Sequence, residues 1–299
     1  MSLYLGSTFI GNGNYLGNIN ITDNNIFVPA PPIVLIDYLI IGGGGAAQAL
    51  DFNSSCGAGG AGGFISGSTN FVVGTSNPNI SVGYPGLRTQ GAVVATDPGA
   101  DGGDSIFLGL TAVGGGGGGQ SNAGSTFVGP GRTGGSGGGA GATQKSSAGS
   151  ATGTGGTSVS EQGFDGGQSF TAGSSGTWRA GSGGGAGGAA TSASSGVAST
   201  PGNEKAWLDG FNYAGGGNAN STTATNTSSG SGGTTKNNTS VGTEGKGGLV
   251  KLRYSGSTAL FTGGDISISG GYVYHSFNMG TQPSFSPGTT TNYTLVYTG

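Results

Sequence analysis

Residues 33–45 read IVLIDYLIIGGGG, a run of mostly β-branched and apolar side chains that meets a glycine tract directly. The first nine residues suit one buried β-strand, because proline precedes them and glycine follows them. Glycine clusters then alternate with Ser, Thr, Asn and Ala spacers until the chain reaches residue 248. The clusters stand at 42–45, 57–63, 114–119, 134–141, 181–188, 215–217 and 229–233. The junction therefore predicts a buried strand that leads into a glycine-rich region.

The glycine content limits what this region is. Glycine supplies 73 of the 299 residues, and 7% of the chain is charged. Each glycine in regular structure costs about 0.5–1 kcal/mol relative to alanine, which dense backbone hydrogen bonding must offset. Collagen is excluded because its every-third-residue glycine phase breaks repeatedly here, and a structureless linker of this length is uncommon. The remaining interpretation is a bundle of left-handed extended helices of the polyglycine-II kind, joined by hydrogen bonds between helices.

Strand patterns recur beside the glycine clusters, and a helical period of useful length is absent from the sequence. Alternating or β-branched runs lie at 63–65, 70–73, 79–82, 104–108, 110–113 and 249–254. The predicted fold class is therefore all-β with a glycine-rich, polyglycine-II-like helix bundle and little or no α-helix.

Three zones divide the chain. Residues 1–32 hold two short strand patterns, with Tyr-Leu-Gly at 4–6 and again at 15–17, and end in a proline-rich hinge. We expect this zone to be an N-terminal β docking segment. Residues 33–255 form the glycine-rich domain. Residues 256–299 alternate again at 265–269, 272–277 and 293–297, which predicts a small antiparallel β unit.

The order of these motifs resembles the glycine-rich domain of bacteriophage tail-fibre tip, adhesin and other virion appendage proteins. The matching stretches are IDYLIIGGGG at 36–45, GAGGAGGF at 57–64, GGDSIF at 102–107 leading to TAVGGGGGG at 111–119, and GGLVKLRY at 247–254. The chain departs from the family in its richer Ser and Thr content and in the spacer at 46–56. The resemblance implies a β framework capped by a polyglycine-II-like bundle and, in adhesin members, host recognition through loops.

The expected function is a structural bacteriophage virion protein, a tail fibre, fibre tip or surface appendage that binds host-cell-surface glycans. Its location would be the virion, after assembly in the host cytoplasm. One alternative is a capsid decoration or capsid fibre protein without a receptor role. A second is a soluble polyglycine-II protein that binds ice or glycans, although the threonines lack the regular spacing that an ice-binding face needs.

Two features of the sequence resemble parts of enzyme motifs, but the residues around each favour another interpretation. Gly42-x-Gly44-x-x-Ala47 matches a dinucleotide-binding fingerprint in letters, but the following helix and the acidic residue about twenty positions on are missing. Ser-His-Asp chemistry would require His275, the only histidine, for which we expect a surface or stacked position in a strand. We therefore expect a protein that is not an enzyme, with no catalytic residues, cofactor or metal.

The charge, the apolar stretches and the possible metal ligands of the sequence disfavour three kinds of partner, which are nucleic acid, a membrane and a metal ion. The net charge is −3 without a basic run, which disfavours nucleic acid. The longest apolar stretch, 33–41, is too short to span a bilayer. Cys56 is expected to be an inert packed thiol, and Asp97, Asp101 and Asp104 to form turns rather than a calcium site.

Receptor contact is expected where aromatic and charged side chains gather in segment 203–213. The candidates there are Trp207, Asp209, Phe211 and Tyr213, since aromatic faces beside carboxylates suit sugar rings. Trp178 with Arg179 is a smaller candidate. The alternative interpretation is that these aromatics anchor the segment to the bundle or to a neighbouring subunit.

The expected partners are other virion proteins through the N-terminal segment, a host surface polysaccharide or outer-membrane protein, and further copies of the chain. We expect a homotrimer, because β zones with exposed edges gain from closing around a symmetry axis.

Overall fold

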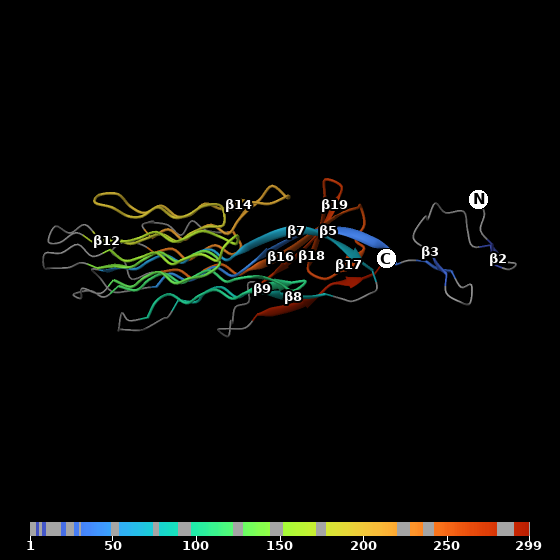
Figure 1. Ribbon diagram of the computed structural model, residues 1–299, viewed down its shortest axis with the longest axis horizontal. Coiled ribbons are helices and arrows are strands. Elements are labelled where there is room, and N and C mark those ends of the chain that lie inside the picture. Colours follow the sequence, from blue (N-terminus) through green and yellow to red (C-terminus); the bar gives the residue numbers. More distant parts are fainter. Residues whose placement is uncertain are drawn as a thin grey trace.

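The computed structural model describes residues 4–5, 8–9, 19–21, 27–29, 31–48, 54–73, 78–88, 97–121, 128–143, 152–171, 178–219, 228–235, 242–279 and 290–298. These residues form β-strands and extended segments, and none of them is helical (Figure 1). All paired strands run antiparallel. The all-β prediction is confirmed.

The largest sheet has five strands in the order β18-β19-β16-β5-β7. The strand predicted from the sequence, β5 (Ile33–Ile41), pairs along its whole length with β7 (Phe64–Val72). On its other side it pairs with β16 (Leu249–Ser255), and β19 (Tyr272–Asn278) and β18 (Asp265–Ser269) follow. Side chains alternate between the two faces, so even-numbered residues of β5 and β16 share one face and odd-numbered residues share the other.

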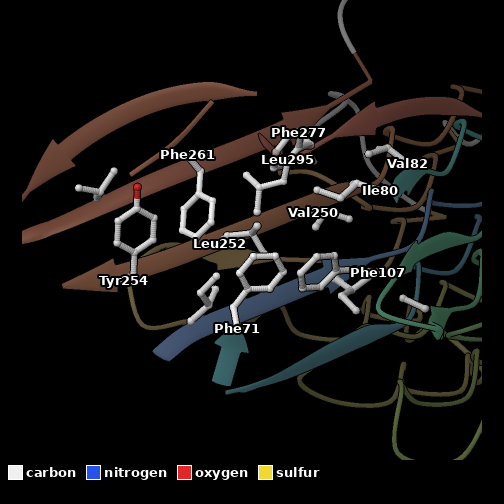
Figure 2. Close-up of a cluster of buried hydrophobic side chains, with 14 of the residues drawn as sticks. Phe71, Ile80, Val82, Phe107, Val250, Leu252, Tyr254, Phe261, Phe277 and Leu295 are labelled. Carbon is white, nitrogen blue, oxygen red and sulfur yellow. The ribbon is translucent and has the colours of Figure 1, made fainter. Parts of the chain in front are cut away.

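A second sheet covers the even-numbered face. Its order is β10 (Leu110–Ala112), β9 (Ser105–Phe107), β8 (Asn79–Val82) and β20 (Thr291–Thr294). The short pair β17 (Phe261–Thr262) and β21 (Val296–Tyr297) adds Phe261 to the same core. Figure 2 shows this core, whose labelled members are Phe71, Ile80, Val82, Phe107, Val250, Leu252, Tyr254, Phe261, Phe277 and Leu295.

The remaining strands form two-stranded pairs. They are β1 (Tyr4–Leu5) with β2 (Thr8–Phe9), β3 (Ile19–Ile21) with β4 (Phe27–Pro29), β6 (Ser54–Ser55) with β11 (Ala142–Thr143), β12 (Phe170–Thr171) with β13 (Trp178–Arg179), and β14 (Lys205–Ala206) with β15 (Asn212–Tyr213). Of the two strands expected in the N-terminal zone, β1 lies within 4–6, whereas 15–17 falls outside the described residues.

Residues 256–299 supply the strands β17 to β21. Within this zone β19 pairs with β16 and β20 pairs with β8, so its strands complete the same two sheets to which the glycine-rich domain contributes. Alternation in a sequence predicts a strand but not the strand's partner. Because β16 ends at residue 255 and pairs with β19, the expected boundary at residue 255 lies between two neighbouring strands of one sheet.

The glycine-rich segments between β5 and β16 that lie outside the two large sheets and outside the 205–213 segment run side by side away from those sheets and bond to one another laterally (Figure 1). We call these segments the glycine-rich body and the two large sheets the β half. In segment 42–47, successive backbone N–H groups donate to three neighbouring segments in rotation. Gly42 and Gly45 donate to Gly63 and Gly60, Gly43 and Ala46 donate to Gly103 and Ala100, and Gly44 and Ala47 donate to Lys246 and Thr243. Every third residue thus meets the same neighbour, and segment 57–63 repeats this rotation.

The sheets continue into these glycine-rich segments. Two neighbours of segment 42–47 are 57–63, which leads into β7, and 242–248, which leads into β16. These are the two strand partners of β5. The third neighbour, 97–104, leads into β9 of the second sheet. The two sheets are separated by the side chains of the core between them. In the segments that follow, which consist mostly of glycine, the same two layers come within direct hydrogen-bonding distance.

Glycine is required by this close approach. A Cβ placed on Gly118 would lie 1.9 Å from the carbonyl oxygen of Gly57, far inside van der Waals contact, and the obstructing atom is backbone. At Gly188, by contrast, a Cβ would meet its nearest atom, in the Asn203 side chain, at an ordinary 3.6 Å.

We expect Gly118→Ala to destabilise the protein by about 3 kcal/mol or to prevent folding, because overpacking against backbone cannot be relieved by a rotamer change. The matched Gly188→Ala variant should stay within about 1 kcal/mol of wild type. Thermal unfolding followed by circular dichroism measures both. Equal melting temperatures for the two variants would contradict this account of the glycines.

Candidate functional site

The segment predicted for receptor contact folds as a hairpin beside the five-stranded sheet. β14 pairs with β15, and Gly210 adopts a φ of 82° in the turn between them. The Asp209 carboxylate stabilises this turn by accepting the Phe211 N–H at 3.1 Å. Two apolar side chains of the hairpin, Leu208 and Phe211, are exposed, with 65% of Phe211 accessible to solvent.

Trp207 and Tyr213 anchor the hairpin. They are 7% and 8% exposed and pack with Leu39, Phe64 and Leu249 on the odd-numbered face of the sheet. The indole Nε1 of Trp207 is buried and has no hydrogen-bond partner among the described residues, so the ring contributes apolar packing. Because both rings are covered by the protein itself, they are not available to a ligand at this surface.

A largely buried ion pair fixes the hairpin to β16. Lys251 Nζ lies 2.6 Å from Asp209 Oδ2, and the Tyr213 hydroxyl donates to the same oxygen at 2.7 Å. Burial alone would raise the pKa of the Asp209 carboxyl, but the hydrogen bonds from Lys251 and Tyr213 outweigh burial and hold that pKa below its usual value. Burial and the Asp209 carboxylate raise the pKa of the Tyr213 hydroxyl.

A second ion pair lies next to the first. Arg253 donates to Asp37 Oδ2 through Nε and Nη2, at 3.1 and 2.8 Å, and through Nη1 to the Leu208 carbonyl. Its guanidinium stacks 4.2 Å from the centre of the Tyr272 ring. Arg253 therefore joins the hairpin, β5 and β19, and its charge is already matched by Asp37.

The resulting surface offers apolar and aromatic contacts rather than free charge. Beside the hairpin, Ile33 and Leu35 are exposed at the start of β5. A groove of about 410 Å³ opens there, with Leu35, Asp37, Ser255 and Tyr272 in its lining. Stacking on a sugar ring or packing against apolar groups is the chemistry that this surface supports.

The structure separates the sequence-predicted candidates. Asp209, Trp207 and Tyr213 form the anchor, and Phe211 is accessible to a partner. Trp178 and Arg179 lie in β13 instead, where Trp178 packs on a cluster of buried alanines. Its strand partner β12 lies toward the far end of the glycine-rich body, whereas β14 lies near the sheets (Figure 1).

Sequence reasoning missed the sheet residues of this surface. They are Asp37, Lys251, Arg253, Tyr272 and Tyr274. The alternation of 249–254 could have placed Lys251 and Arg253 together on the face opposite the core. It could not have placed Asp209 against them, because the hairpin is distant in sequence.

His275 is fully buried within a hydrogen-bonded chain. Its ring stacks on Tyr254, with centroids 5.7 Å apart. Nδ1 lies 2.8 Å from the Gly263 carbonyl and must donate to it, so Nε2 accepts from the Tyr254 hydroxyl, which itself accepts the Leu260 N–H. Burial lowers the pKa of His275. The stacked position expected from the sequence is present, inside the core rather than at the surface.

The other reactive groups have structural partners. Cys56 is buried, which raises the pKa of its thiol to about 11. Asp104 and Asp101 accept the N–H groups of Gly114 and Gly117, both at 2.8 Å, in place of neighbouring backbone. The described ranges contain no group of three or more side chains suited to holding a metal ion. No helix in the described part of the chain is long and apolar enough to cross a membrane.

The comparisons with known proteins give one match. Residues 22–274 match a family described as a glycine-rich domain. No curated protein and no solved structure matches the chain.

We expect Lys251→Met to destabilise the protein by about 3 kcal/mol, because it leaves the Asp209 carboxylate buried without its cation. The exposed pair Arg132–Asp101 provides the control, and Arg132→Met should cost less than about 1 kcal/mol. Denaturant unfolding measures both. Adding Asp209→Asn to Lys251→Met should recover part of the loss, and a strictly additive double variant would contradict a coupled pair.

His275 should make stability depend on pH. Because its folded pKa is lowered from 6.5, the unfolded chain binds the proton more readily, so the contribution is complete above 6.5 and is lost as the pH falls. We expect His275→Gln to flatten the pH dependence of the unfolding free energy between about pH 7 and about pH 5. Asp209 titrates in a lower window, below its usual 3.8. Identical slopes for wild type and variant would refute the assignment to His275.

Proposed function

The chain belongs to the glycine-rich domain family, and we propose that it is a structural protein of a bacteriophage virion, serving as a tail fibre, fibre tip or surface appendage. The observation that carries the proposal is the laterally bonded glycine-rich body. A body held by backbone hydrogen bonds in three directions is stiff without an apolar core. Stiffness with short connecting segments suits a projecting particle component better than a catalyst.

The glycine-rich body is best described as a polyglycine-II-like bundle. That helix has three residues per turn and no internal hydrogen bonds, so its N–H groups point to three neighbours in turn. The rotation of donors along 42–47 and 57–63 supports this description. The many positions where a Cβ would collide with neighbouring backbone support it as well.

Attachment is proposed to use the β half. Of the exposed large apolar side chains among the described residues, only Phe164 and Val197 lie in the glycine-rich body. The others lie on or beside the sheets, including Ile33, Leu108 and Ile268. Exposed apolar groups gathered at one part of a protein favour contact with other proteins. Together with the N-terminal segment, this half would hold the chain to other virion proteins and to its own copies.

Host recognition is proposed for the surface around Phe211 and Leu208, with a cell-surface polysaccharide or outer-membrane protein as the receptor. Trp207, Asp209 and Tyr213 hold this surface in place rather than contact the receptor. Trp178 with Arg179 would form a separate contact in the glycine-rich body.

A labelled copy of the protein, located on virions by electron microscopy, tests the proposal. Label at the tail or its fibres is the expected result. Label distributed over the capsid would favour the alternative of a capsid decoration or fibre protein. Absence of the protein from purified particles would remove the virion assignment.

We expect Phe211→Ala combined with Leu208→Ser to reduce adsorption to host cells about tenfold or more, because exposed aromatic anchors dominate binding energy. Melting temperature and incorporation into particles should be unchanged, since both side chains are exposed. The matched control is Phe164→Ala, an exposed aromatic of the glycine-rich body that should adsorb normally. Normal adsorption by the double variant would remove the receptor role of this surface.

A further inference from the structure

Among the described residues, no strand pairs with the outer edge of β18. β18 is the first strand of the five-stranded sheet and pairs with β19 alone, and no described strand lies on its other side. All five of its residues are exposed. An edge strand of this kind presents unpaired N–H and C=O groups that another strand can bond.

Apolar side chains distinguish this edge. Ile266 and Ile268 are 44% and 52% exposed, although they lie opposite the buried residues His275 and Val273 on the core side of the sheet. The opposite edge strand, β7, exposes the polar side chains Ser66, Ser68 and Asn70 instead. β18 also lacks the lysine and proline that commonly protect edges from association.

The sequence of β18, DISIS, is complementary to itself in the antiparallel direction. One register pairs all five residues of two such strands, with Ser267 opposite Ser267 of the second strand. In that register Ile266 faces Ile268, and Asp265 faces Ser269, so like charges are not opposed. Isoleucine pairs on one face and serines on the other match the requirements of a cross-strand ladder.

We propose that β18 pairs antiparallel with β18 of a second copy of this chain across a two-fold axis, which joins two five-stranded sheets into one continuous sheet. Such an interface uses the same surface on both copies and therefore closes at two. The proposal differs from the trimer expected from the sequence. It is also independent of the virion assignment, because it concerns purified protein alone.

Cysteine cross-linking of the full chain tests the register. In Ser267→Cys the two new thiols would stand opposite each other, with Cα atoms about 4.5–5.5 Å apart, which suits a disulfide. In the control Ser269→Cys they would be about 14 Å apart, separated by four residues of strand rise. The native Cys56 is buried and does not compete.

Mild oxidation should yield a covalent dimer from Ser267→Cys about tenfold or more faster than from Ser269→Cys, because the reaction is then intramolecular. Sedimentation of the unmodified protein should give twice the 28.5 kDa of one chain. Equal cross-linking of the two variants, or a mass of one or three chains, would overturn the pairing. Neither result would bear on whether the protein is found in virions.

A charge exchange supplies a second test. Because Ser267 would face itself, Ser267→Lys and Ser267→Asp should each sediment as single chains, owing to like charges directly opposite one another. An equimolar mixture should restore the two-chain species. Dimers of either variant alone, or a mixture that remains single chains, would overturn the two-fold register.

Discussion

Backbone hydrogen bonding without side chains is the constraint on which the rest of the structure depends. An extended segment that bonds to itself nowhere must find partners for its N–H and C=O groups in other segments. A Cβ at Gly118 would lie 1.9 Å from the oxygen of Gly57, so the required approach is open to glycine alone at that position. The high glycine content and the hydrogen bonds between segments are therefore linked. Glycine stabilises the glycine-rich body because it has no Cβ and lets neighbouring segments approach closely enough to bond.

The β framework determines which segments become neighbours. Pairing of β5 with β7 and β16 places 42–47 between 57–63 and 242–248. The core between the sheets fixes how the second layer lies over the first, through contacts such as Tyr38 with Phe107. After Ile41 the chain continues with four glycines, and the two layers approach each other to hydrogen-bonding distance. Ser105, whose hydroxyl donates to the Ile41 carbonyl at 2.6 Å, lies at this transition.

Local features were predictable from the sequence, and long-range pairing was not. The strands at 33–41, 79–82 and 249–254 appear where alternation or β-branched runs predict them. The runs at 63–65 and 70–73 belong to one strand, β7, because pairing with β5 carries the intervening Ser66, Gly67 and Ser68. The aromatic side chains of segment 203–213 distinguish it from the rest of the glycine-rich region in the sequence. Its position depends on Lys251, and a charge pair between distant segments leaves no periodic signal.

The rotation of hydrogen bonds also limits where the chain can change in length. Along 42–47 every third N–H reaches the same neighbour, so one inserted residue would direct each later donor toward a different segment. Such an insertion would misdirect all donors that follow it in the segment. An insertion in a connection between segments shifts none of them. We therefore expect variation in length, and any new contact surface that comes with it, to occur only in the connections and in hairpins such as 205–213. An insertion there does not change the register of the hydrogen bonds between the glycine-rich segments.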